Sequence, residues 1–73
     1  MIYELRGLIY GKFDSQKKCA DALGWTRQQI NAICLGKREA TVGEVYQLAE
    51  ILECDPRIIA EMLHRYHTNL KRA

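Results

Sequence analysis

The stretch QKKCADALGWTRQQINAICLG, residues 16–36, decides the fold, because it predicts two short helices joined by a tight turn. Gly24 ends the first helix, since glycine readily adopts the left-handed backbone conformation that a sharp helix end requires. Thr26 then stands where the second helix needs an N-cap, and Gln29 follows it at the spacing of a capping box. These signals predict one helix over residues 16–23 and a second helix that begins after Thr26.

The apolar residues of this stretch indicate how the two helices pack. Ile30 and Ile33 share one face of the second helix, and Ala20 places a small side chain where the helices cross. A helix pair joined by a short glycine-containing turn is the sequence form of a DNA-binding helix-turn-helix. The pattern resembles the Cro/C1-type (XRE-like) helix-turn-helix family of small phage repressors and Cro-like regulators. The residues that carry the resemblance are Gln16, Ala20, Gly24, Ile30, Ile33 and the loop Gly36-Lys37-Arg38.

The rest of the chain predicts three further helices and no strand. Apolar residues recur at helical spacing over residues 2–11. Thr41 and Glu44 form a second capping-box pair before a helix that reaches about residue 53. Asp55 followed by Pro56 supplies an N-cap and a first helical residue for the last helix.

The expected fold is all-α: a five-helix, lambda-repressor-like DNA-binding domain. The resemblance, which spans about residues 4–63, implies this architecture, and the helical spacing agrees with it. A chain of 73 residues forms one domain, which we place at residues 1–66. Residues 67–73 are polar and basic, and we expect them to form a frayed tail.

The charged residues are unevenly distributed along the chain. The formal net charge is only +2. Residues 1–38, however, hold seven basic and three acidic side chains, whereas residues 39–70 hold two basic and six acidic ones. A positive helix-turn-helix half suits the phosphates of nucleic acid, and a negative remainder does not oppose that.

Other classes of function find little support in the sequence. Three cysteines, widely spaced, fit neither a disulfide framework nor a zinc motif, and we expect them to be reduced core residues of a cytoplasmic protein. His64 and His67 lack the further ligands of a metal site. No apolar run is long enough to span a membrane. No catalytic constellation is visible, so we expect no enzyme, cofactor, metal or small-molecule ligand.

The outward face of the second helix carries side chains suited to reading bases. With Ile30 and Ile33 inward, the opposite side presents residues that hydrogen-bond guanine or adenine or touch a thymine methyl group. The resemblance implies the same role for several of these positions. The expected base contacts are Arg27, Gln28, Asn31 and Ala32.

Phosphate contacts are expected beside this helix. Gln16 starts the first helix, where backbone amides favour an anion, and in related repressors the matching glutamine also steadies the residue that corresponds to Arg27. The expected phosphate contacts are Gln16, Lys17, Lys37 and Arg38, although simple solvation of Lys17 is an open alternative. Trp25, in the turn, has two interpretations: a ring stacked on DNA, or a hydrophobic anchor between helices. The large area that tryptophan buries favours the anchor.

The apolar stripe of the last helix indicates self-association. One recognition helix reads too few base pairs to select a site, so a homodimer on a near-palindromic operator is expected. The expected interface residues are Ile59, Met62 and Tyr66, with the alternative that the whole stripe is core. The predicted function is a sequence-specific transcriptional regulator that binds double-stranded DNA, encoded by a bacterium or a phage. An antitoxin, an excision-type accessory protein and a protein-interaction module remain alternatives.

Overall fold

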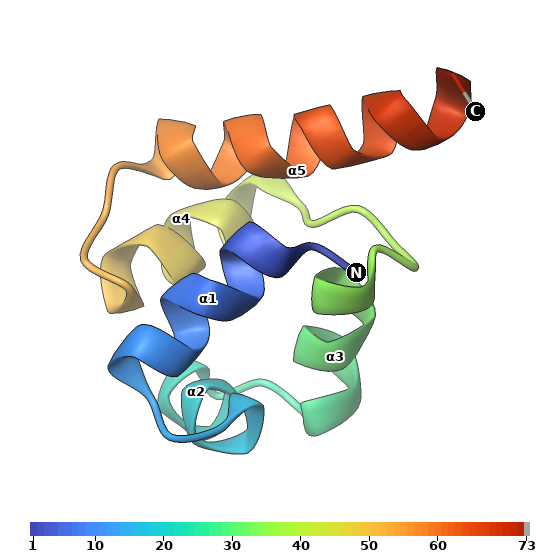
Figure 1. Cartoon of the computed structure of the whole chain (residues 1–73). Helices are drawn as coiled ribbons and strands as arrows, with labels where there is room; N and C mark the ends of the chain where they lie inside the picture. Colours follow the sequence, from blue (N-terminus) through green and yellow to red (C-terminus); the bar gives the residue numbers. More distant parts are fainter. Residues whose placement is uncertain (73) are drawn as a thin grey trace.

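Five helices make up the part of the chain that the structure, a computed structural model, describes: residues 1–72, with side chains to residue 68. The prediction of an all-α, five-helix fold is confirmed, and the described residues contain no strand. No helix in this range combines the length and the apolar character that a membrane span requires. The helices, shown in Figure 1, are α1 (Tyr3–Lys12), α2 (Gln16–Leu23), α3 (Arg27–Leu35), α4 (Val42–Ile51) and α5 (Pro56–Arg72).

Side-chain caps begin most of these helices where the sequence predicts them. The Thr26 hydroxyl accepts from the backbone N–H of Gln29 at 3.1 Å, and Asp55 accepts from the N–H two residues on at 2.9 Å. Thr41 and Glu44 form a complete capping box. The Gln29 side chain differs from the prediction, because it donates to Glu44 at 2.7 Å instead of returning to its own cap.

The core lies where all five helices meet. α1 packs on α2, α3 and α5, while α4 packs on α2 and α5. Two of the three cysteines, Cys19 and Cys34, are fully buried, and burial raises the pKa of the Cys34 thiol to about 11, which keeps it protonated. The core residues are Ile2, Leu5, Ile9, Cys19, Ala20, Ile30, Ile33, Cys34, Leu48, Ala49, Leu52, Ile59, Met62 and Leu63.

The apolar stripe of α5 corrects the expected dimer interface. Ile59 is 0% exposed and Met62 is 5% exposed, so both are core residues of a single chain. Tyr66 is half-buried against the core. The reason is that α1 and α4 both pack against the same side of α5 (Figure 1), and its whole inward face is used. The helix also continues to Arg72, beyond the end of the expected domain at residue 66.

Two glycines end the two helices of the helix-turn-helix in the left-handed conformation. Gly24 follows α2 with φ of 76°, and Gly36 follows α3 with φ of 77°. A Cβ added at Gly24 would meet nothing within 4 Å. A Cβ at Gly36 would lie 2.1 Å from the Tyr66 ring, which packs directly against this glycine. At Gly24, only the left-handed backbone conformation requires glycine. At Gly36, both the backbone conformation and the contact with Tyr66 require it.

The two glycines form a matched pair for a stability test. We expect Gly24→Ala to cost about 1–2 kcal/mol of unfolding free energy, the usual strain of a left-handed alanine. Gly36→Ala should cost a further ~1–3 kcal/mol, because the Tyr66 ring must move. Urea unfolding measures both. Adding Tyr66→Leu should recover part of the excess in the Gly36 variant only, and equal losses in the two single variants would contradict this account.

Candidate nucleic-acid interface

The second helix of the pair, α3, is oriented as its apolar spacing predicts. Ile30 and Ile33 are buried, and they hold α3 against the core. Arg27, Gln28 and Asn31 are exposed on the other side of the helix. Ala32, which the sequence also predicts as a base contact, is half-buried.

A hollow of about 630 Å³ lies where α1, the start of α2 and the start of α3 meet. Five residues predicted to contact DNA line it: Gln16, Lys17, Arg27, Gln28 and Asn31. The remaining predicted contacts, Ala32, Lys37 and Arg38, are not part of its wall. The sequence interpretation missed the other wall residues, which are Met1, Arg6, Tyr10 and Ser15.

The basic side chains around the hollow are not neutralised by the described carboxylates of the protein. Among the residues that the structure describes, no carboxylate lines the hollow. Among the described residues, four basic side chains form no ion pair, and three of them are in this wall: Arg6, Lys17 and Arg27. The fourth, Lys37, follows the end of α3. The basic residues that do form ion pairs are Lys12, Lys18, Arg38, Arg57 and Arg65.

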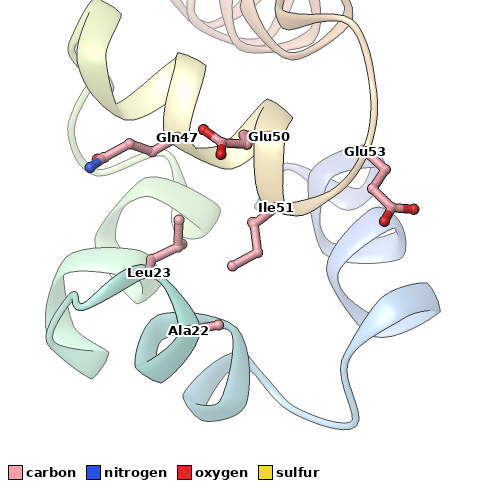
Figure 2. A pocket seen from close by; sticks show the side chains of 6 residues that line it. All are labelled: Ala22, Leu23, Gln47, Glu50, Ile51 and Glu53. Atoms are coloured by element: carbon pink, nitrogen blue, oxygen red, sulfur yellow. The ribbon is translucent and has the colours of Figure 1, made fainter.

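A second groove, between α2 and α4, has the opposite character. Figure 2 shows Ile51 on α4 and Leu23 on α2 pointing toward one another, with Glu50 next to Gln47 on α4 and with Glu53 at one end. Within the described part of the chain, no basic side chain lines this groove. Two carboxylates repel phosphate, so this side of α2 does not suit nucleic acid.

Trp25, in the turn between α2 and α3, is the hydrophobic anchor that the sequence favours. The side chain is half-buried and packs against the core. Its indole Nε1–H donates to Gln47 Oε1 at 3.2 Å, which satisfies its single donor. The ring therefore joins the turn to α4.

Arg38 has a structural role that the sequence did not indicate. Its guanidinium donates to both carboxylate oxygens of Glu44, at 2.9 and 2.6 Å. The same carboxylate accepts from the Thr41 N–H at 2.8 Å and from the Gln29 side chain. These donors, with Arg38 first, lower the pKa of Glu44 to about 2. The charge of Arg38 is therefore engaged within the fold, whereas Lys37 remains unpaired.

His64 and His67 share a small hollow with one carboxylate, that of Glu39. No group of three or more metal-binding side chains occurs in the described part of the chain. Apolar side chains of α4 and α5 border the same hollow.

Comparison with known proteins identifies the family. A family model of helix-turn-helix proteins matches residues 14–59, from the start of α2 into α5. The chain belongs to this family, the Cro/C1-type (XRE) helix-turn-helix proteins, which are DNA-binding transcription regulators. Comparisons with curated proteins and with solved structures give no significant match.

The buried Glu44 predicts an acid-sensitive contribution to stability. The folded-state pKa is about 2, against an ordinary value of 4.5. Its contribution is therefore complete above pH 4.5 and is lost as the pH falls from 4.5 toward 2, by about 3 kcal/mol in all. Glu44→Gln should remove this component from the pH dependence of urea unfolding. Glu53→Gln is the matched control, since Glu53 is an exposed carboxylate paired with Lys12; an equal effect of both changes would contradict the assignment.

Proposed function

We propose that this chain is a sequence-specific transcriptional regulator of the phage repressor or Cro kind, which places α3 in the major groove of operator DNA. The observation that carries the proposal is the hollow at the start of α3. Side chains that the sequence marks for DNA contact converge there, together with unpaired cations and no carboxylate. Unneutralised cations on one surface attract the phosphate backbone, and Arg, Gln and Asn side chains read base edges.

Base reading and phosphate binding fall to different residues in this proposal. Arg27 and Gln28 lie in the first turn of α3, the end that reaches deepest into the groove, and Asn31 follows one turn later. Ala32 lies beside them and suits a thymine methyl group. Gln16 and Lys17 at the start of α2, with Lys37 after α3, bind phosphates. Arg38 stays a predicted phosphate contact of the loop, but its ion pair with Glu44 cancels much of its charge, so we expect it to contribute less than Lys37.

A homodimer on a two-half-site operator belongs to the same proposal, with a different interface from the one first expected. Val42 is 73% exposed and Tyr46 is 60% exposed on α4, and they line a hollow with Val45, Pro56 and Ala60. This set, which we call the α4–α5 patch, is apolar and shares no residue with the hollow at the start of α3. A second copy is its proposed occupant, since one recognition helix covers too short a site for selective binding.

Selection of bound sequences from random duplex DNA tests the function directly. We expect enrichment of a motif with two related half-sites about one DNA turn apart, as two-fold symmetry requires. Enrichment of a single short motif would support sequence-specific DNA binding but would contradict the proposed homodimer. No enrichment at all, with weak and salt-insensitive binding, would overturn the proposal and favour a protein-interaction role on the same fold.

Two substitutions separate specificity from general affinity. Arg27→Ala should cost about 1–3 kcal/mol on the selected site and relax the preference at one base pair. Lys37→Ala should weaken binding to all duplexes about equally and reduce the slope of log affinity against log salt by about 0.9. Titrations on the selected site and on scrambled duplexes, at several salt concentrations, measure both effects. Retention of the full sequence preference by the Arg27 variant would remove Arg27 from the base contacts.

Charge placed in the α4–α5 patch tests the dimer. Tyr46→Glu should weaken self-association by about tenfold or more, since it buries a carboxylate in an apolar interface. Tyr3→Glu is the matched control, because Tyr3 is also exposed, at 75%, but lies on α1. Sedimentation equilibrium measures both variants. A parent chain that stays monomeric even on operator DNA, or equal effects of the two changes, would place the interface elsewhere.

A further inference from the structure

Arg6 and Tyr10 of α1 form the wall of the hollow that faces the helix-turn-helix. They lie one helical turn apart, so their side chains are neighbours on the surface of α1. Both are exposed, while Leu5 and Ile9 beside them are buried in the core. Neither residue falls within residues 14–59, the range that the family model matches.

The Arg6 guanidinium is held in place without a carboxylate. It lies over the Tyr10 ring, 5.4 Å from the ring centre, and its Nη1 donates to the Met1 sulfur at 3.2 Å. The aromatic face attracts the cation and restricts its position, yet leaves its charge unneutralised. A planar guanidinium with free N–H donors is suited to bind a phosphate with two parallel hydrogen bonds.

The α1 wall is fixed relative to α3. The backbone N–H of Ile2 donates to the carbonyl of Cys34, in the last turn of α3, at 2.8 Å. The amino group of Met1 donates to Tyr66 Oη at 3.0 Å, and that hydroxyl donates to the carbonyl of Leu35 at 3.4 Å. Figure 1 shows the N-terminus beside the upper end of α3. A cation on α1 is therefore held at a set place relative to the helix that reads bases.

We propose that Arg6, supported by Tyr10, binds a backbone phosphate of the same duplex whose bases α3 reads, so that the DNA interface extends from the helix-turn-helix onto α1. Lys17 and Arg27 line the same hollow, and three cations that share a hollow repel one another unless an anion lies among them. This assignment rests on the proposed function. It adds a contact that carries affinity and no sequence preference.

Arg6→Gln is the variant that tests the assignment, with Arg57→Gln as its matched control. Both arginines are exposed and both changes remove one charge, but Arg57 pairs with Asp55 at the start of α5. Binding of a labelled duplex that carries the selected site is titrated at several salt concentrations. Arg6→Gln should weaken binding to selected and scrambled duplexes alike and reduce the salt slope by about 0.9, while Arg57→Gln leaves the slope unchanged.

Tyr10→Leu tests the support for the guanidinium. It should weaken binding in the parent chain and have little further effect in the Arg6→Gln background, because the ring acts through Arg6. Circular dichroism on each variant confirms that the helices are retained. Additive losses for the two changes would remove Tyr10 from the assignment and leave Arg6 alone.

The outcomes separate this inference from the function on which it rests. A parent chain without salt-dependent binding to duplex DNA would overturn the function itself. A parent chain that binds, together with equal salt slopes for Arg6→Gln and Arg57→Gln, would overturn only the α1 contact. A change of base preference in Arg6→Gln would show a base contact in place of the phosphate contact.

Discussion

The hydrogen bonds to the Glu44 carboxylate are the interactions on which the arrangement of the helix-turn-helix most depends. The carboxylate accepts hydrogen bonds from Gln29 on α3, from Arg38 in the following loop and from Thr41 at the start of α4. One buried anion thus joins three segments that follow one another in the chain. Removing a partner from such a group leaves a buried charge uncompensated, which is far more costly than the loss of a surface ion pair. The position of α3 relative to α4 is therefore set by charge as well as by apolar packing.

The ion pairs divide the basic side chains on the surface into two groups. Lys12, Lys18, Arg57 and Arg65 each face a carboxylate, and their positive charge is largely cancelled close to the surface. Arg6, Lys17 and Arg27 have no such partner and meet at one hollow. A net charge of +2 conceals this arrangement, because none of the described acidic side chains lines that hollow. The proposed attraction for phosphate rests on this local excess of positive charge and not on the net charge of the chain.

The sequence predicts the helices well because the signals that start and end them are local. Thr26, Thr41 and Asp55 each cap a helix within a few residues, and Gly24 ends one through its own backbone. The inward direction of Ile30 and Ile33 follows from helical spacing alone, and the exposure of Arg27 and Gln28 follows from it.

The sequence does not reveal the contacts that depend on how the helices pack against one another. The Gln29 side chain has a good local partner at its own cap, and only the approach of α4 supplies Glu44 as a better one. Ile58 and Ile59 are adjacent and equally apolar, yet only the packing of α5 against α1 and α4 decides that Ile59 is core and Ile58 is half-exposed. Arg6 and Tyr10 join the candidate interface because α1 lies beside α3, and no local pattern predicts that placement.

The Tyr66 side chain packs against Gly36 and connects Met1 with the end of α3. These contacts affect the order in which the domain folds during synthesis. A ribosome releases the helix-turn-helix segment well before residue 66. Until that tyrosine arrives, the last turn of α3 lacks its covering ring, and the start of α1 lacks one of its ties to α3. Contacts between residues so far apart in sequence close late in folding, because they carry the largest loop-closure cost. The candidate DNA interface is thus completed only when nearly the whole domain has left the ribosome, so a nascent chain does not present the finished candidate interface.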